Sequence, residues 1–141
     1  VIHDITTDTT DVPKFKAAVA LRGSDSNSLA IKNDTIAQQL AAYPNIRTIK
    51  VDTDYTSAFS KAVNTAKSLG WNVHHVDADN GLIEAYQTTT LWKFTDDIVI
   101  RVQEKNDRVH VDVRSISRIG SGDLGANAKR IARFINEYPV N

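Results

Sequence analysis

Two neighbouring segments decide the fold: residues 96–102 read DDIVIRV, and residues 108–118 read RVHVDVRSISR. Apolar and polar side chains alternate in both, which is the pattern of β-strands with one buried face. The segments predict a β-hairpin whose loop is Lys105 and Asn106. In this register apolar residues meet on one side: Ile98 with Val113, Ile100 with Val111, and Val102 with Val109. The other side sets Arg101 opposite His110, Val99 opposite Asp112, and Asp97 opposite Arg114.

Further elements are expected around this hairpin in the second half of the chain. Residues 55–69 place apolar side chains at helical spacing and end at Gly70, a common helix stop. Strands are expected over residues 71–77 and 82–88, joined by the turn Asp79-Asn80-Gly81. Residues 124–138 predict a last helix, with these side chains on its apolar face: Leu124, Ala128, Ile131 and Ile135.

The first third of the chain is less regular. Pro13 is expected to open a short helix over residues 14–21. Thr35 and Gln38 have the spacing of a capping box, so a short helix should follow them and end before Pro44. Residues 46–51 alternate as an edge strand would.

The order of these elements predicts an α+β fold: a four-stranded antiparallel sheet in the order α-β-β-β-β-α, with the helices packed on one face. At 141 residues the chain is expected to form a single domain, residues 1–141. Residues 46–141 make the α+β core, and residues 1–45 make an irregular or helical N-terminal extension. Ile100 and Val111 should be buried beneath the helices.

Composition narrows the classes of function. Seventeen Lys and Arg balance seventeen Asp and Glu, whereas a domain that binds duplex DNA normally carries a basic excess, so we expect no nucleic-acid partner. The absence of Cys excludes disulfides, thiolate metal ligands and a Cys nucleophile. No run of 18 apolar residues occurs, so no transmembrane segment is expected in this chain. Because the chain contains no Met, we expect either a mature product or a trimmed chain, and a membrane tether could lie upstream.

Four charged residues are candidates for a functional charged face of the sheet: Glu84, Asp97, Arg101 and Asp112. Paired carboxylates suit general acid and base catalysis, so a hydrolytic site is one interpretation. The interleaved Arg114 and Arg118 favour the other interpretation, a structural lattice of ion pairs in which the carboxylates stay ionised. We assign no catalytic residue.

Metal and nucleophile motifs are weak. His74 and His75 point to opposite faces of a strand, and residues 77–81 match a calcium loop only in part, because the glycine is one position early. Ser115, Ser117 and Ser121 lie in no nucleophile elbow. We expect no metal site and no cofactor.

A candidate small-molecule site lies where the last strand meets the last helix. Residues 113–133 are rich in Lys and Arg, and a glycine-rich loop precedes a helix N-terminus, which attracts anions. The expected ligand is a phosphate, a carboxylate or a lipid headgroup. The alternative is that Asp123 or Ser121 simply caps the helix. The candidate ligand-binding residues are Arg114, Arg118, Ser121, Asn127 and Arg130.

Seven segments resemble one family: IHDITTD at 2–8, YPNI at 43–46, GWxV at 70–73, GxIEA at 81–85, FxDDIVIRV at 94–102, VDVRSxSR at 111–118 and SxDLGxN at 121–127. Over nearly all of residues 2–137 the chain is similar to the uncharacterised family known as domain of unknown function 1499. The tripeptide Asp11-Val12-Pro13 departs from that family's Asp-Pro-Pro. The resemblance implies a bacterial or plastid protein whose relatives often carry N-terminal membrane segments or targeting peptides, hence a location in the cell envelope, at a membrane or in a plastid. It implies no activity.

Two functions stay open. The favoured one is a non-enzymatic binding or accessory domain, the soluble part of a membrane- or envelope-associated protein, with a small anion or a protein as its partner. The alternative is a hydrolytic enzyme that uses the charged sheet face. A deep pocket that holds Glu84 or Asp97 without a paired arginine would favour the enzyme, and a face with every charge paired would favour binding.

Overall fold

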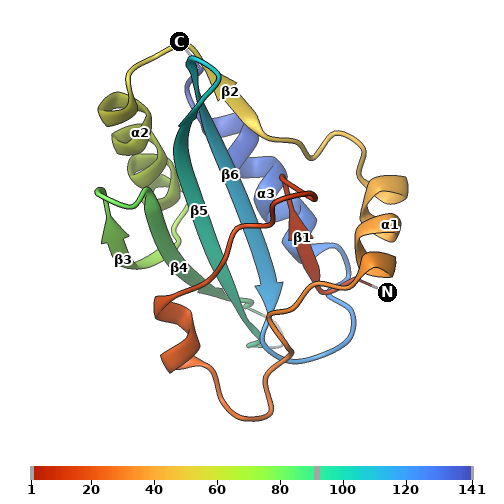
Figure 1. The fold of residues 1–141 in the computed structure, drawn as a ribbon. Helices are drawn as coiled ribbons and strands as arrows, with labels where there is room; N and C mark the ends of the chain where they lie inside the picture. Colours follow the sequence, from red (N-terminus) through yellow and green to blue (C-terminus); the bar gives the residue numbers. More distant parts are fainter. Residues whose placement is uncertain (1, 91–92, 141) are drawn as a thin grey trace.

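The computed structural model describes residues 2–90 and 93–140, and its centre is a six-stranded antiparallel sheet (Figure 1). Four strands follow one another as the sequence predicts: β3 (Asn72–Asp77), β4 (Leu82–Thr88), β5 (Thr95–Lys105) and β6 (Arg108–Ser117). Two short strands, β1 (Asp4–Thr6) and β2 (Ile49–Val51), pair with the outer edge of β6. The α+β class is therefore confirmed, whereas the expected number of four strands is wrong.

The two short strands lie along the outer side of β6, which would otherwise be an exposed edge of the sheet. Ile5 pairs with Ser115 and Ile49 pairs with Val111, so β6 has strand partners on both sides. An unpaired edge of this length would be open to aggregation. Three residues are too few to show a strand period, which is why the sequence pattern places residues 4–6 in an irregular extension.

The β5–β6 hairpin forms, but its register differs by two residues from the expected one. Its loop is Asn106 and Asp107, whose φ angles are 53° and 63°. Asn and Asp adopt this left-handed conformation at lower cost than Lys, so they displace Lys105 from the turn. A shift of two residues keeps every side chain on its expected face and changes only the partners. The observed partners include Val102 with Val111, Ile100 with Val113, and Arg101 with Asp112.

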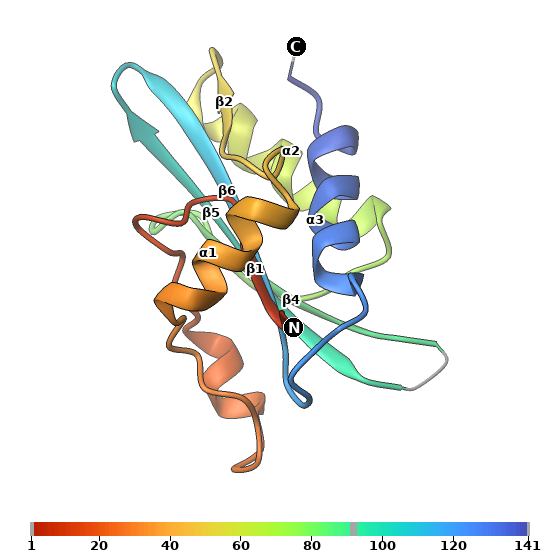
Figure 2. The same cartoon turned by 90° about the vertical axis from the view of Figure 1, so that its right-hand side faces the viewer.

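Two helices cover the apolar face of the sheet (Figure 2). The helix α2 (Tyr55–Ser68) begins at Asp54, whose carboxylate accepts a hydrogen bond from the Ser57 N–H at 2.7 Å. The helix α3 (Ala126–Glu137) packs against β6 and α2. Ile100 and Val111 are buried beneath them, as predicted. The largest buried side chains of this core include Phe59, Trp71, Ile83, Ile98, Ile131 and Phe134.

The helix α3 starts two residues later than the sequence predicts. Asp123 sets its start, because its carboxylate accepts hydrogen bonds from the N–H groups of Gly125 and Asn127 at 2.8 and 2.9 Å. Leu124 has a φ of 53° and is 93% exposed, so its expected place on the apolar face is wrong.

The N-terminal segment, residues 7–32, crosses the opposite face of the sheet (Figure 1). It contains only a short 3₁₀ helix, η1 (Ala17–Leu21), where a helix over residues 14–21 is expected. The helix α1 (Asn33–Ala42) then lies beside β1 and ends before Pro44, as predicted. It begins after Lys32, so Thr35 lies within its first turn and the expected capping box is wrong.

Candidate functional site

The polar face of the sheet is covered rather than open. The N-terminal segment lies on it, and the carboxylates expected there are buried: Glu84 and Asp97 are 0% exposed and Asp112 is 1% exposed. The fourth residue of the expected charged face, Arg101, has a side chain that is 16% exposed. The charged residues of this face therefore bind the N-terminal segment to the sheet.

Glu84 holds the start of η1. Its carboxylate accepts hydrogen bonds from the backbone N–H groups of Ala17 at 2.6 Å and Ala18 at 3.0 Å, and longer ones from Lys16. These N–H groups have no partner inside a short helix, so a carboxylate is well suited to them. Glu84 thus has no arginine partner, but it is fully bound.

Asp97 lies between two arginines. Arg118 donates two hydrogen bonds to it, both at 2.9 Å, and Arg22 of the N-terminal segment donates a third at 2.6 Å. The bonds to Asp97 raise the pKa of the Arg118 guanidinium. The expected pair of Asp97 with Arg114 is wrong, because Asp97 stands opposite Ile116 in the observed register.

Arg114 pairs instead with Asp4 of β1, through two hydrogen bonds at 3.0 and 2.7 Å. It also donates to the backbone carbonyls of Pro13 and Leu29, which lie before and after η1 in the N-terminal segment. With 3% of its surface exposed, Arg114 holds this segment from inside the protein.

Asp112 accepts hydrogen bonds from the hydroxyls of Thr7 and Thr48, both at 2.6 Å, and lies 3.4 Å from Arg101. Arg101 also donates to Asp8 at 3.0 Å. Partial burial pushes the pKa of Asp8 upward, but bonds from the backbone and from Arg101 outweigh it and hold this pKa below its usual value.

The five candidate ligand-binding residues do not converge on one site. Arg114 and Arg118 lie under the N-terminal segment, whereas Asn127 and Arg130 lie on the opposite, helix-covered face. Ser121 is exposed in the loop before α3, where its carbonyl oxygen lies 3.3 Å from the His3 ring. The N-terminus of α3 already binds the Asp123 carboxylate.

Asn127 and Arg130 do meet, in a buried polar cluster beneath α3. Arg130 Nη1 lies 3.0 Å from Asn127 Oδ1, 3.1 Å from Ser115 Oγ and 2.8 Å from Asp96 Oδ2. The contact with Asp96 is ionic, without the alignment of a hydrogen bond. Burial raises the pKa of Asp96 above its usual 3.8, and the Arg130 guanidinium offsets part of that rise.

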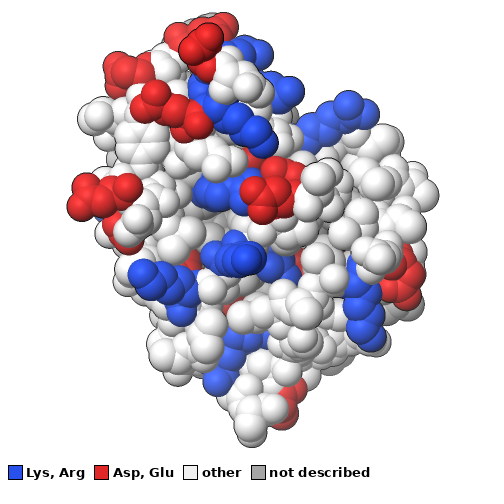
Figure 3. All heavy atoms as spheres, viewed as in Figure 1, with Lys and Arg blue, Asp and Glu red and all other residues white. Residues whose placement is uncertain are grey.

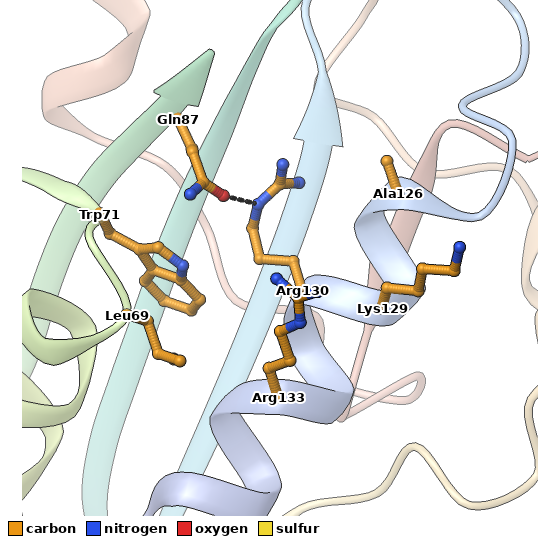
Figure 4. A pocket seen from close by; sticks show the side chains of 7 residues that line it. All are labelled: Leu69, Trp71, Gln87, Ala126, Lys129, Arg130 and Arg133. Carbon is orange, nitrogen blue, oxygen red and sulfur yellow. Dashed lines mark hydrogen bonds between the residues drawn. The ribbon is translucent and has the colours of Figure 1, made fainter. Parts of the chain in front are cut away.

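Beside this cluster a cleft opens between α3 and the start of β3 (Figure 4). We call it the cationic cleft; its volume is about 200 Å³, and it is lined by Leu69, Trp71, Gln87, Ala126, Lys129, Arg130 and Arg133. Leu69 and Trp71 face the helix from one side, and Arg130 reaches from α3 to Gln87 on β4, where its Nε donates at 2.8 Å. Three of the seven lining residues are cations, and none is a carboxylate.

The cations of the cleft differ in how they are held. Arg130 is 7% exposed and fixed by its partners. Lys129 and Arg133 are exposed, and neither forms an ion pair with any residue that the structure describes. They lie four residues apart on one helix, a spacing at which like charges repel.

The face that carries the N-terminal segment has a band of Lys and Arg down its middle (Figure 3). A shallow hollow of about 590 Å³ near the β5–β6 turn includes Arg47, Lys50, Lys105 and His110. Burial lowers the pKa of His110, and the neighbouring lysines lower it further. Unlike the cationic cleft, this hollow also contains two carboxylates, Asp8 and Asp11, which pair with Arg101.

Part of the cationic cleft was predictable from the sequence. Arg130 is in the candidate set, and the basic excess of residues 113–133 includes Lys129 and Arg133. Their shared side of the helix was a signal that could have joined them to Arg130. Trp71 immediately precedes β3 and Gln87 lies on β4, so both are far from α3 in sequence and no local pattern connects them to it.

Among residues 2–90 and 93–140, no three His, Asp or Glu side chains are grouped so that they could hold a metal ion. No helix in the described part of the chain has the length and apolarity to span a membrane.

Comparison with known proteins agrees with the resemblance seen in the sequence motifs. Residues 4–137 match the family described as "Protein of unknown function (DUF1499)". The chain has no match among curated proteins. Since the match covers all of the sheet and all of the helices, the chain belongs to the DUF1499 family of proteins of unknown function.

Proposed function

We propose that residues 1–141 form a single domain that binds a small anion without changing it chemically, and that the anion binds in the cationic cleft. One observation carries this proposal: Lys129, Arg130 and Arg133 line one cleft, and of these three cations only Arg130 has a carboxylate partner, Asp96, among the described residues.

The repulsion between Lys129 and Arg133 supports an anionic ligand. Like charges at this helical spacing destabilise the helix by about 0.2–0.5 kcal/mol when nothing lies between them. An anion in the cleft would turn that repulsion into two attractive contacts. Arg130 would add a third contact at little entropic cost, because Gln87 and Asp96 already hold its side chain.

The size of the cleft favours a small ligand. Its volume of about 200 Å³ lies below the ~300–1,000 Å³ that is usual for pockets of drug-sized ligands. A phosphate or carboxylate group fits this scale, and either group accepts paired hydrogen bonds from arginine.

The alternative of a hydrolytic enzyme has less support. A general acid or base must reach its substrate, whereas Glu84, Asp97 and Asp112 are buried and bound by the N-terminal segment or its neighbours. A location in the cell envelope, at a membrane or in a plastid stays a proposal that rests on the family resemblance.

Titration with inorganic phosphate, and separately with acetate, tests the proposal. We expect saturable amide shifts in residues 126–133 and at the Trp71 indole N–H. Arg133→Gln should weaken binding about tenfold or more, since a hydrogen bond to a charged group contributes ~1.5–3 kcal/mol. Lys67→Gln is the matched control, because Lys67 is an exposed helical cation outside the cleft. The absence of saturable shifts at tens of millimolar of either anion would contradict the proposal.

A further inference from the structure

A second hollow lies on the other side of α3 from the cationic cleft. We call it the apolar groove; its volume is about 440 Å³, and it runs between α3 and the segment that follows α1. Its lining is mostly carbon and includes Tyr43, Pro44, Ile46, Leu124, Ala128 and Ala132. The only charged residue that lines it among the described residues is Lys129.

Leu124 is held in an unfavourable state at the edge of this groove. Its side chain is 93% exposed, and its φ of 53° lies in the left-handed region that costs a non-glycine residue stability. Neither property contributes to the folded core. Leu124 is therefore free to contact an aliphatic ligand at the rim of the groove without loss of core packing.

Lys129 connects the two hollows. It lines both the cationic cleft and the apolar groove, and it is exposed on α3 between Ala128 and Arg130. The methylene stem of a lysine can cover an aliphatic chain while its ammonium pairs with an anion. The cationic cleft and the apolar groove therefore adjoin at Lys129.

We propose that the anion bound by this domain is the headgroup of a single-chain amphiphile, such as an alkyl phosphate or an aliphatic carboxylate. This inference rests on the proposed function. The headgroup lies in the cationic cleft against Lys129 and Arg133, and the aliphatic chain lies in the apolar groove against Leu124 and Ala132. The charges of the cleft and the carbon lining of the groove complement the two ends of such a molecule.

Calorimetric titration with monoalkyl phosphates of four, six and eight carbons, each below its micellar concentration, tests this inference against inorganic phosphate alone. We expect the Kd to fall by up to about fourfold per added methylene, the factor that corresponds to ~0.8 kcal/mol per buried CH₂. Octanol and octyltrimethylammonium, which have the same chain without the negative charge, should bind at least tenfold more weakly than octyl phosphate.

A pair of variants separates the groove from the cleft. Ala132→Trp fills the groove and should remove the dependence on chain length while leaving phosphate binding intact. Ala41→Trp places the same side chain on an exposed position of α1 outside the groove and should change neither.

Each contrary result has a separate meaning. Equal Kd values for phosphate and for all alkyl phosphates would overturn this inference and leave the proposed function standing. Binding to anionic vesicles without binding to the monomeric amphiphiles would also overturn it, in favour of a bilayer surface. If no anion of any kind binds, both proposals fail.

Discussion

Removing the carboxylate of Asp97 should loosen the N-terminal segment where Arg22 binds it to the sheet. In Asp97→Ala, Arg22 and Arg118 lose their shared partner, and both were bound to it at 2.6–2.9 Å. Loss of one partner from a buried ion pair costs ~3–5 kcal/mol. We expect about 3 kcal/mol, the lower end of that range, because the Arg118 side chain is 21% exposed and can regain water.

This loss converts to a change in Tm. Unfolding entropy is about 2.1 cal/mol/K per residue, and over 141 residues it makes 3 kcal/mol equivalent to roughly 10 °C. Asp52→Ala is the matched control, because its pair with Arg108 is 2.8 Å long but exposed on both sides. An exposed pair contributes at most about 1 kcal/mol, or about 3 °C.

Hydrogen exchange supplies a second readout. Amides of residues 14–30 should exchange faster in Asp97→Ala than in the parent protein, because the bond from Arg22 to Asp97 that ties this segment to the sheet is lost. Exchange of the β5 and β6 amides should change less, because their ladder hydrogen bonds remain. If Asp97→Ala lowers the Tm no further than Asp52→Ala does, the carboxylate does not hold the segment and the reasoning is refuted.

Three more results are expected. Gly81→Ala should lower the Tm more than Gly70→Ala does. A Cβ at Gly81 would lie 2.1 Å from the Val102 carbonyl oxygen, whereas a Cβ at Gly70 would meet nothing within 4 Å. Equal losses of Tm would contradict this reasoning. Leu124→Asn should raise the free energy of unfolding by a few tenths of a kcal/mol or more, since asparagine tolerates a positive φ and the exposed leucine loses no burial. Urea unfolding measures this change, and a lower free energy of unfolding would contradict the reasoning. Measured by ¹³C NMR, the pKa of the Asp96 carboxyl should lie above its usual 3.8. The stability that this carboxyl contributes is therefore fully present below pH 3.8 and is lost as the pH rises through the pKa of the folded state. A pKa at or below 3.8 would show that the Arg130 guanidinium outweighs burial.

The period of two in residues 96–118 was enough to predict which side chains face the helices. It was not enough to predict the register, because a shift of two residues leaves the apolar match intact. Only the turn distinguishes the two registers, and the signal was present in Asn106 and Asp107, which accept positive φ.

The cover over the polar face could not be predicted in the same way. An irregular segment has no period, and here it is held by single contacts between residues far apart in sequence, such as Glu84 with Ala17. The split of the candidate ligand site was predictable in part. Alternate residues of a strand point to opposite faces of the sheet. Arg114 and Arg118 therefore face away from Ser115, which bonds to Asn127, so one ligand could not contact both the arginines and Asn127.

The pairing of β1 with β6 sets the order in which the chain can fold during its synthesis. Asp4 pairs with Ile116, so β1 can join its partner only after all the residues between them have been made. Glu84 and Asp97, which bind the N-terminal segment, precede β6 in the chain, whereas β1 has no strand partner until β6 exists. Because contacts between distant residues form slowly, we expect the pairs of β3 with β4 and of β4 with β5 to form before β1 joins the sheet.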